Sequence, residues 1–438
     1  MKAMRLSCLT IGCLLAVSVM AQPTARQWNS DVKAGWTLGN QLECPPGGWN
    51  NESTSFGNPA NAMQAETTWG NPMVTLQTLQ AVKAAGFDAV RIPVRWQCHI
   101  TDALQMTIDA QWLQHVKEVV DWCLACDMKV VINTHHDKWL ESRPTYYYQT
   151  ENNQKLALLW TQIADAFKDY DYRLAFAGTN EVHVPNNWNA PTAENQAVQN
   201  SYNQTFVNAV RATGGNNLKR HLVVQTYNCS ADFGLSGFTT PTDIADNGND
   251  YMSVEIHYYT PWDYCGSTGY YYWGEAYKGY GPIPAHNEQT LHNDMESFAQ
   301  TWGSQGLGVL IGEWGVTDHW TTTGRMALIH QNMTYYCKSL VEEARNQGFS
   351  TFVWDNSVFG NGEEKFGIFD RNNNMTLVAD WILSGILQGV ASDILQPTLP
   401  SSLFPLTSKK VLHKGKIYIR KGDKRYNLHG QQLEEGGE

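Results

Sequence analysis

The sequence predicts an α/β fold, a (β/α)8 TIM barrel followed by a short basic C-terminal β-hairpin tail. Short apolar runs rich in β-branched residues recur between residues 36 and 356, and segments with helical periodicity fill several of the gaps. Strands that alternate with helices over such a length favour a parallel sheet covered by helices, and eight strands close a barrel. A doubly wound open sheet shares this alternation, but no glycine-rich nucleotide fingerprint follows the first run.

Each predicted strand ends in polar or aromatic residues. The eight runs span residues 36–42, 89–94, 130–136, 174–181, 221–228, 252–259, 309–314 and 351–356. Three of the intervening helices have apolar residues at helical spacing and a glycine as their C-terminal stop, at Gly86, Gly214 and Gly348.

The composition is that of a well-folded soluble enzyme. The 438 residues include 42% hydrophobic and 12% aromatic residues, and 42 acidic against 31 basic side chains give a net charge of −11. This content excludes a disordered or collagen-like chain, and the acidity argues against a nucleic-acid partner. Lys2 and Arg5, followed by a short apolar run and a small-residue cleavage site, predict a signal peptide over residues 1–21. No later segment is long and apolar enough to span a membrane, so we expect an exported mature chain.

The seven cysteines after residue 21 constrain the structure little. They are Cys44, Cys98, Cys123, Cys126, Cys229, Cys265 and Cys337. The odd count leaves at least one thiol unpaired in a monomer. Cys123 and Cys126 form a C-x-x-C inside an amphipathic run, where both thiols suit a helix–sheet core. Without a second pair, neither a zinc site nor a redox motif is favoured.

Charge divides the chain near residue 392. Residues 22–391, the predicted catalytic domain, hold 21 basic and 37 acidic residues for a net of −16, whereas residues 392–438 carry +3. Residues 392–408 are predicted to be a proline-containing linker, and residues 409–438 a basic tail. Alternation at 416–419 and 425–428 around a Gly-Asp turn predicts a hairpin in that tail.

Polar residues collect where the predicted strands end. They are Asn40, Arg91, Arg95, His135, His136, Asp137, Asn180, Glu181, Asn228, His257, Tyr259, Glu313, Trp354 and Asp355. The carboxyl ends of barrel strands meet at one mouth, so this convergence predicts an active site there. Glu181 ends the fourth run and Glu313 lies at the end of the seventh, nearly across the barrel. Two facing carboxyl groups suit glycoside hydrolysis, in which one protonates the leaving oxygen and the other attacks carbon or activates water.

The chain resembles glycoside hydrolase family 5, a clan A family of retaining (β/α)8 enzymes that includes many endo-β-1,4-glucanases. The resemblance covers about residues 30–385 and rests on seven motifs in family order: Gly35-Trp36-Thr37-Leu38-Gly39-Asn40, Arg91-Ile92-Pro93-Val94, Asn133-Thr134-His135-His136-Asp137, Asn180-Glu181, His257-Tyr258-Tyr259, Ile311-Gly312-Glu313-Trp314-Gly315 and Trp354-Asp355-Asn356. Two positions depart from the family pattern: Val182 replaces the usual proline after the acid/base, and Asp137 stands where glutamate is common.

The resemblance implies that Glu181 is the acid/base and Glu313 the nucleophile. It also implies supporting roles for the other residues of the mouth. Arg91 would keep the nucleophile ionised, Tyr259 would donate a hydrogen bond to it, and Asn180 would bind the sugar 2-hydroxyl. His135 and His257 would shape the sugar subsite, and Trp354 would offer its indole face to a pyranose. Glu255 has no assigned role, and loop aromatics such as Trp69, Trp139, Trp188, Trp262 and Trp273 are candidates for lining the cleft.

These features predict a secreted or cell-surface endo-β-1,4-glucanase that acts on cellulose or related β-glucans and needs no cofactor or metal. A β-mannanase or xyloglucanase on the same fold is the alternative. A zinc hydrolase using His135, His136, Asp137 and His257 is disfavoured, because adjacent residues on a strand point to opposite faces. A non-catalytic carbohydrate-binding barrel would not need opposed carboxylates. The tail resembles the C-terminal sorting tails of Bacteroidetes type IX secretion substrates, which implies a secretion machinery as partner; a basic hairpin packed on the acidic body is the other reading.

Overall fold

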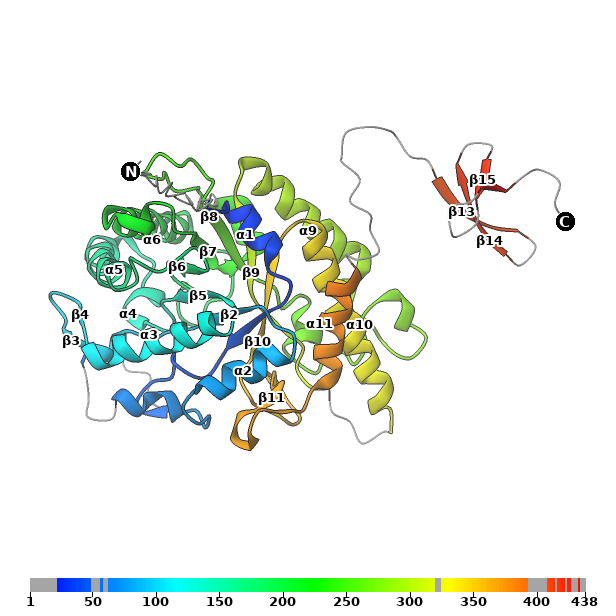
Figure 1. Cartoon of the computed structure of the whole chain (residues 1–438), viewed down its shortest axis with the longest axis horizontal. Helices are drawn as coiled ribbons and strands as arrows, with labels where there is room; N and C mark the ends of the chain where they lie inside the picture. The colour runs from blue at the N-terminus through cyan, green and yellow to red at the C-terminus, as the bar shows by residue number, and fades with distance from the viewer. Residues whose placement is uncertain are drawn as a thin grey trace, which may run out of the picture. The chain divides into compact units, whose positions relative to one another are not determined.

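Eight parallel strands close into a barrel in the computed structural model, and helices surround them (Figure 1). Around the barrel the order is β1-β10-β9-β8-β7-β6-β5-β2, and β2 pairs with β1. The strands are β1 Gly35–Leu38, β2 Ala89–Ile92, β5 Lys129–Asn133, β6 Leu174–Ala177, β7 Leu222–Ser230, β8 Met252–His257, β9 Gly308–Trp314 and β10 Ser350–Asp355. The predicted TIM barrel is therefore confirmed.

The structure describes residues 22–48, 56–57, 62–319 and 324–392, together with the backbone of short strands between residues 408 and 433. The predicted signal peptide at 1–21 and nearly all of the predicted linker at 392–408 lie outside the described residues. The chain divides into two compact units, residues 1–393 and 394–438.

Helices α2 to α10 occupy the connections between the barrel strands, α1 precedes the first strand, and α11 follows the last. They are α1 Ala25–Asp31, α2 Leu76–Ala84, α3 Ala110–Ala125, α4 Lys138–Glu141, α5 Tyr146–Ala166, α6 Ala193–Ala212, α7 Ala231–Gly237, α8 Trp262–Cys265, α9 Glu288–Thr301, α10 Met326–Asn346 and α11 Asp380–Ala391. Gly86, Gly214 and Gly348 follow α2, α6 and α10 with φ values of 108°, 71° and 75°. They accept the left-handed backbone that ends a helix, as predicted.

The loops contain short 3-10 helices and short strands. The 3-10 helices are η2 Ala62–Thr67, η3 Gln97–His99, η4 Gly215–Leu218, η5 Glu275–Tyr277, η6 Gly303–Gln305 and η7 Arg371–Asn373. Two small antiparallel pairs join β3 Ile100–Asp102 to β4 Thr107–Ile108 and β11 Phe369–Asp370 to β12 Thr376–Leu377.

Strand alternation separates the barrel interior from the layer beneath the helices. On β2, Val90 and Ile92 pack in the large strand–helix core, whereas Ala89 belongs to the small interior cluster. Arg91 shares the face of Ala89, so its charged side chain points into the barrel. This alternation explains how a charged residue inside an apolar run reaches the barrel mouth.

Helix α1 closes the other end of the barrel. Its Trp28 belongs to the interior cluster, and the amide of Ala25 donates to the Asp250 carbonyl at 2.6 Å. Asn29 is fully buried and bridges two distant strands: its Nδ2 donates to Ser253 Oγ at 2.7 Å, and its Oδ1 accepts from Ser350 Oγ at 2.7 Å. The start of the described chain is thus joined to the first residues of β8 and β10.

The second unit forms a four-stranded antiparallel sheet. Its strands are β13 Ser408–His413, β14 Lys416–Lys421, β15 Lys424–Tyr426 and β16 Gln432–Leu433. The predicted hairpin corresponds to β14 and β15, where Lys421 pairs with Lys424; the expected Gly-Asp turn lies outside the described residues. The prediction missed the flanking strands β13 and β16, because two-residue strands and a mixed polar pattern give little periodic signal.

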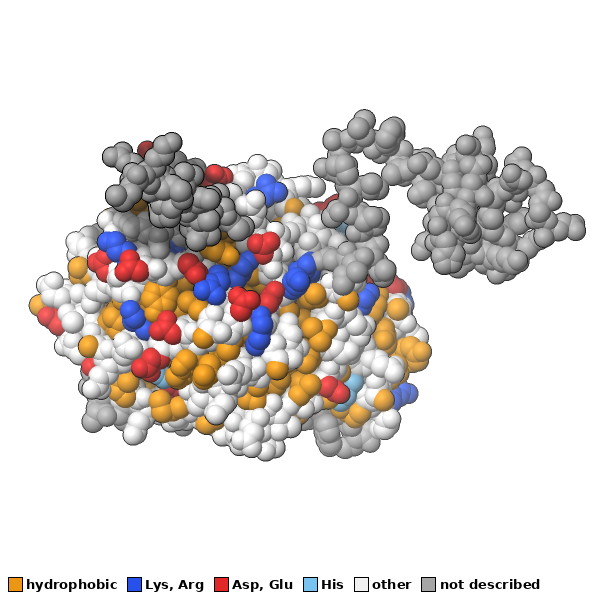
Figure 2. Space-filling model, viewed as in Figure 1, with side chains coloured by type: hydrophobic (Ala, Val, Ile, Leu, Met, Phe, Trp, Pro, Cys, Tyr) orange, Lys and Arg blue, Asp and Glu red, His pale blue; other side chains and the backbone are white. Residues whose placement is uncertain are grey.

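The described surface shows no segregation of charge on the face seen in Figure 2, where basic and acidic side chains intermingle between apolar ones. No helix within the described ranges is both long and apolar enough to cross a bilayer. All seven described cysteines are free thiols, and six of them are buried. Cys123 and Cys126 lie at the end of α3, where the Cys123 side chain packs into the strand–helix core.

A buried histidine on η3 is expected to make the fold acid-sensitive. His99 stacks on Trp112 with ring centroids 3.6 Å apart, and neither ring nitrogen has a hydrogen-bond partner within the described part of the chain. Burial lowers the pKa of His99 from 6.5 to about 3, with Arg95 and His115 adding to the shift. Below pH 6.5 the His99 imidazole therefore binds a proton in the unfolded chain but stays neutral in the folded chain.

We expect the lowered pKa of His99 to reduce the free energy of unfolding by about 2 kcal/mol when the pH falls from 7 to 5. Urea unfolding of wild type and His99→Phe at both pH values measures it, and the variant should lose less stability on acidification. His292→Phe, at a half-exposed position, is the control and should not flatten the pH dependence. Equal slopes for wild type and His99→Phe would contradict the prediction.

Candidate active site

Arg91 lies at the centre of the polar cluster in the barrel mouth. Its guanidinium is fully buried and donates to three side chains from three other strands or their loops. Nε donates to Glu255 Oε1 at 2.9 Å, Nη1 to Glu313 Oε1 at 2.9 Å, and Nη2 to Asn180 Oδ1 at 2.8 Å. A buried guanidinium with two carboxylate partners is compensated, and its fork fixes the positions of the three acceptors.

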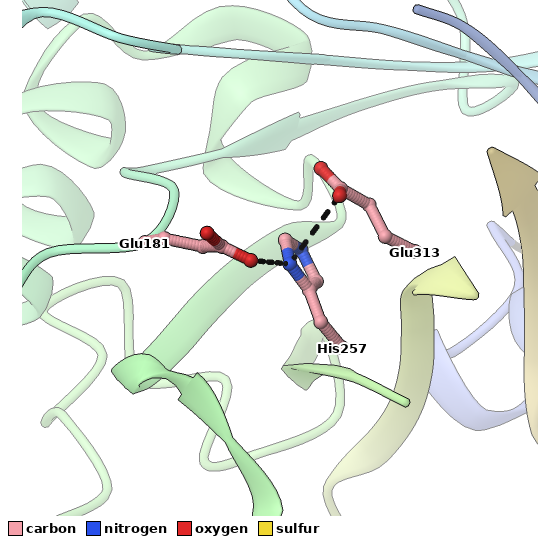
Figure 3. A group of neighbouring side chains, drawn as sticks. All are labelled: Glu181, His257 and Glu313. Carbon is pink, nitrogen blue, oxygen red and sulfur yellow. Dashed lines mark hydrogen bonds and ion pairs between the residues drawn. The ribbon is translucent and has the colours of Figure 1, made fainter. Parts of the chain in front are cut away.

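Glu181, His257 and Glu313 converge as Figure 3 shows, with the imidazole between the two carboxyl groups. His257 Nδ1 lies 2.6 Å from Glu181 Oε1 and 3.6 Å from Glu313 Oε2. One ligand atom from each of the three residues lies within 4.8 Å of the others. The predicted pair of carboxyl groups therefore faces a common point in the mouth.

The two glutamates have different surroundings. Glu313 lies on β9, and both of its oxygens accept hydrogen bonds, Oε1 from Arg91 and Oε2 from the Tyr259 hydroxyl at 3.2 Å. Two donors are the partners an ionised carboxylate requires. Glu181 follows β6 by four residues, is 31% exposed at its side chain, and bonds only His257 among the described side chains. Glu181 is thus the carboxyl group more open to solvent.

Asn180, His135 and Trp354 line the other side of the mouth. Asn180 Nδ2 lies 3.5 Å from His135 Nε2, and His135 Nδ1 lies 3.2 Å from Asn133 Nδ2. The His135 ring stacks with Trp354 at a centroid distance of 5.9 Å. Burial lowers the pKa of His135 well below its ordinary value, so the imidazole is neutral. The structure therefore brings together all eight residues predicted for the site.

Several predicted strand ends lie beyond the observed ones: the first run was expected to continue to residue 42, but β1 ends at Leu38, and the third to residue 136, but β5 ends at Asn133. The fourth strand was expected to continue to residue 181, but β6 ends at Ala177. The Gly178 amide still donates to the Val223 carbonyl on β7, but the next amide, that of Thr179, donates to the Gln225 side chain at Oε1, at 2.8 Å. Asn180 and Glu181 consequently lie on a loop rather than on the strand itself.

Sequence reasoning assigned no role to the residues that support Arg91. Glu255 is fully buried on β8 and accepts from Arg91 with one oxygen and from Gln225 Nε2 with the other, at 2.7 Å. Cys229 donates from Sγ to the Asn180 carbonyl at 3.3 Å. The only signal for Glu255 was its position two residues before His257, on the same face of the strand.

The titration of the site is dominated by His257. Burial disfavours its charged form, but the Cys229 thiol, Glu313 and the bond with Glu181 raise the pKa of His257 well above its ordinary value. Burial opposes ionisation of Glu181, yet the hydrogen bond and charge of His257 lower the pKa of Glu181. Burial raises the pKa of Glu313 against the opposing influence of His257 and Arg91. A proton therefore resides in the 2.6 Å bond between Glu181 and His257.

Glu181, His257 and Glu313 also offer ligand atoms at metal-binding spacing. A cation there would have to displace the bond between His257 and Glu181 and would meet the guanidinium of Arg91, which lies 2.9 Å from Glu313. The argument that His135 and His136 point to opposite faces of a strand was wrong, because β5 ends at Asn133 and the two rings lie 4.2 Å apart. Their nitrogens are nevertheless engaged elsewhere: both His135 nitrogens face asparagine amides, and His136 Nδ1 faces Glu141. The donor set suits proton transfer better than metal binding.

Gly312 has no side chain, and the carboxyl group of Glu255 fills the space that a side chain at position 312 would need. A Cβ at position 312 would lie 1.8 Å from Glu255 Oε1. Because Glu255 is buried, Gly312→Ala should displace it from Arg91 and move Glu313 out of position. We expect turnover to fall about 100-fold, measured as kcat on a soluble glycan substrate. Gly303→Ala, where a Cβ meets nothing within 4 Å, is the control; unchanged turnover in Gly312→Ala would contradict the prediction.

Comparison with known proteins points to one family. A family model described as cellulase (glycosyl hydrolase family 5) matches residues 53–360. Endoglucanase A of Paenibacillus barcinonensis is 33% identical over 85% of this chain and 91% of its own length. Cellulase/esterase CelE of Acetivibrio thermocellus is 32% identical over 85% of this chain, which spans 41% of that protein. The solved structure of a Bacteroides ovatus GH5 xyloglucanase with a XXXG heptasaccharide superposes with a TM-score of 0.74 at 33% identity, covering 85% of this chain and 77% of that one.

Proposed function

The chain belongs to glycoside hydrolase family 5, and from this premise we propose that it is an endo-β-1,4-glucanase that retains anomeric configuration. The observation that carries the proposal is the pair of facing carboxyl groups, whose nearest ligand atoms lie within 4.8 Å of one another around His257. Retaining glycosidases hold their carboxyl groups about 5 to 5.5 Å apart, whereas inverting enzymes leave a wider gap for water.

Glu313 is the nucleophile in the proposed first step. Arg91 and Tyr259 donate to its two oxygens, which keeps the carboxylate charged and aims it at the anomeric carbon. Glu181 is the general acid that protonates the leaving oxygen. Its proton comes from the bond with His257: His257 passes the proton to Glu181, and Glu181 passes it to the leaving oxygen, so the step ends with a neutral His257 and an ionised Glu181. The products of the step are a covalent glycosyl-enzyme at Glu313 and a free leaving saccharide.

In the second step Glu181 acts as the general base. It takes a proton from a water molecule that attacks the anomeric carbon. The bond to Glu313 breaks, and Glu313 regains its negative charge and its hydrogen bonds from Arg91 and Tyr259. Asn180, held by Arg91 at 2.8 Å, is positioned to bind the sugar 2-hydroxyl. Such a contact strengthens as positive charge develops on the ring. His135 and Trp354 shape the subsite that holds this sugar.

The substrate we propose is cellulose or a related β-glucan. Initial rates on carboxymethylcellulose, barley β-glucan, xyloglucan, glucomannan and galactomannan test this choice. A β-glucan should be cleaved fastest, with a rapid fall in viscosity that reports internal cleavage. Inertness of the wild-type chain on all five polymers would overturn the proposal. NMR of the first product should show the β-anomer, and an initial α-anomer would overturn retention.

Xyloglucan is the second candidate substrate. It is favoured by the similarity to the Bacteroides ovatus xyloglucanase structure at a TM-score of 0.74. The same polymer panel separates the two, because a xyloglucanase would cleave the branched polymer faster than barley β-glucan. Faster cleavage of either mannan would instead indicate the β-mannanase alternative.

We further propose that residues 1–21 direct export and that residues 409–438 serve a secretion machinery. The proposal rests on the charged and apolar segments of the first 21 residues and on the basic tail described above. Deletion of residues 409–438 should retain the protein inside a bacterium with the matching secretion system, while the full chain reaches the medium or cell surface. Export of the truncated chain at the full-length rate would refute a role for the tail.

A further inference from the structure

We propose that Gln225 is a positioning residue that fixes the loop of the acid/base relative to the nucleophile. The inference rests on the proposed function, because it takes Glu181 as the general acid and Glu313 as the nucleophile. Glu181 lies on the loop after β6, whereas Glu313 lies on β9. A retaining mechanism requires one fixed separation between the two carboxyl groups, so the protein needs contacts that tie these segments together.

The side chain of Gln225 holds the loop at one end and β8 at the other. It is fully buried on β7. Its Oε1 accepts from the amide and the hydroxyl of Thr179, at 2.8 and 3.0 Å. Its Nε2 donates to Glu255 Oε2 at 2.7 Å and to the Val223 carbonyl at 3.2 Å. These four bonds use the whole hydrogen-bonding capacity of a glutamine amide.

The partners of Gln225 determine which way its amide faces. The Thr179 backbone amide can only donate, so it faces the oxygen, and the carboxylate of Glu255 can only accept, so it faces the NH2 group. Burial opposes ionisation of Glu255, yet the charge of Arg91 and the hydrogen bond from Gln225 lower the pKa of Glu255. A glutamate at position 225 would place an acceptor against this carboxylate, and a methionine would bond neither partner.

The bonds of Gln225 close a ring of contacts that includes Arg91. From Glu255 the ring continues to Arg91, whose Nε donates to Glu255 Oε1 at 2.9 Å. The Nη2 of Arg91 donates to Asn180 Oδ1 at 2.8 Å. Asn180 directly follows Thr179 in the chain, and the bond from Thr179 to Gln225 completes the ring. The ring therefore joins the loop after β6 to β2, β7 and β8.

Both catalytic carboxyl groups are attached to this ring. Glu181 is the next residue of the loop, and Glu313 Oε1 accepts from Arg91 Nη1 at 2.9 Å. Loss of the Gln225 side chain would open the ring at its bonds to the loop. It would also leave an oxygen of the buried Glu255 without its donor, which destabilises the position of that carboxylate. The acid/base and the nucleophile would then shift relative to one another.

Helix α6 supports the backbone of Gln225 where strand pairing stops. The regular pairing of β7 with β8 ends at Gln225 and Glu255. Asn203 Nδ2 donates to the Gln225 carbonyl at 2.8 Å. Gln199 Nε2 donates to the same carbonyl at 3.3 Å and to Thr179 Oγ1 at 3.1 Å. Gln199 and Asn203 are one helical turn apart, so one face of α6 holds both partners of the central bond.

Gln225→Met tests the role, because methionine keeps the approximate length of glutamine and loses its hydrogen bonds. We expect kcat on barley β-glucan to fall about 100-fold, the loss typical of a misplacement of about 1 Å. KM should change by less than about threefold, since the residue acts through the catalytic groups and not through substrate binding.

Asn152→Leu is the matched control. Asn152 is buried on α5 and donates from Nδ2 to the Tyr202 hydroxyl at 2.9 Å. This variant should also lower the melting temperature but should leave kcat unchanged. Unchanged kcat in Gln225→Met, an effect on KM alone, or an equal loss of kcat in Asn152→Leu would overturn the proposal.

Gln225→Glu separates the two ends of the side chain. The introduced carboxyl group still accepts from the loop, but it forms a hydrogen bond with Glu255 only while one of the two carboxyl groups is protonated. Each carboxyl group raises the pKa of the other, so we expect the ratio of the variant's kcat to the wild-type kcat to rise about tenfold from about pH 8 to about pH 5. A ratio that stays constant over this range would overturn the bond to Glu255 as the positioning contact.

The ratio is needed because other titratable groups lie near this pair. They come from β2, β7, β8 and β9 and are Arg91, Cys229, His257 and Glu313. Both proteins contain them, so dividing the two kcat values at each pH removes their common contribution.

A spectroscopic measurement keeps the test independent of turnover. His257 Nδ1 lies 2.6 Å from Glu181 Oε1, and a proton in so short a bond gives a downfield NMR signal, which His257→Phe assigns by its absence. Gln225→Met should shift or remove this signal, and Asn152→Leu should preserve it. An unchanged signal in Gln225→Met would overturn the positioning role. Wild-type protein that is inert on every β-glucan but shows this difference would overturn the proposed reaction and not the positioning role.

Discussion

Replacing Glu313 with alanine is expected to reduce kcat on β-glucan by about 10⁴-fold or more, because no other described carboxylate in the mouth is placed to attack the same carbon. Arg91 and Tyr259 would then face a cavity in place of the carboxylate they now hold at 2.9 and 3.2 Å. Added azide should enter that cavity and attack an activated β-glycoside directly. The product is then an α-glycosyl azide, which NMR identifies.

Glu313→Gln is the matched variant, since it keeps the shape of the side chain and removes its charge. It should be as inactive as Glu313→Ala but should gain nothing from azide, because the amide still fills the site. A β-glycosyl azide from Glu313→Ala, or turnover within tenfold of wild type, would show that Glu313 is not the nucleophile.

Glu181→Ala should lower kcat on β-glucan about 10³-fold, within the range that general acid–base catalysis contributes. The loss depends on the leaving group. A 2,4-dinitrophenolate departs without protonation, so the first step on 2,4-dinitrophenyl cellobioside should remain fast and give a burst of phenolate. The second step lacks its base, and the glycosyl-enzyme should accumulate to a level that mass spectrometry detects.

The product formed with azide distinguishes Glu181→Ala from Glu313→Ala. Azide should attack the accumulated glycosyl-enzyme from the side that Glu181 occupied and yield a β-glycosyl azide. His257→Phe serves as the companion, because it removes the partner at 2.6 Å while leaving Glu181 in place. Its activity should persist at a reduced level without azide rescue. If Glu181→Ala slowed the first step equally on glucan and on the dinitrophenyl substrate, with no burst of phenolate, the result would argue against the acid/base role.

Much of the architecture could be predicted because barrel strands are short, apolar and regularly spaced. All eight predicted runs overlap barrel strands, and the ends of those runs carry the residues that meet at Arg91. The structure adds that Arg91 alternates with Val90 and Ile92, so its side chain faces the barrel interior. These are local properties of the chain, which sequence patterns represent well.

The supporting contacts could not be predicted, because they depend on packing between distant segments. Nothing near Gly312 in the sequence indicates that its missing side chain makes room for Glu255 from the neighbouring strand. The stacking of His183 on Trp188 likewise depends on the path of the loop after β6. The early end of β6 follows from one side chain, Gln225, which bonds the Thr179 amide that a strand would have used.

Helix α1 has a consequence for how the protein is made. Asn29 bonds Ser253 and Ser350, and Gly35 on β1 pairs with Phe352 on β10. These contacts join residues separated by 224 to 321 positions in sequence, so neither the barrel nor the layer that α1 closes can be completed on a partial chain. Contacts this distant in sequence slow folding, because the loop between them must first be closed. A chain leaving the ribosome from its N-terminus therefore stays incompletely folded until almost all of the first unit has emerged, which is the state in which a polypeptide can be threaded through a narrow translocation pore.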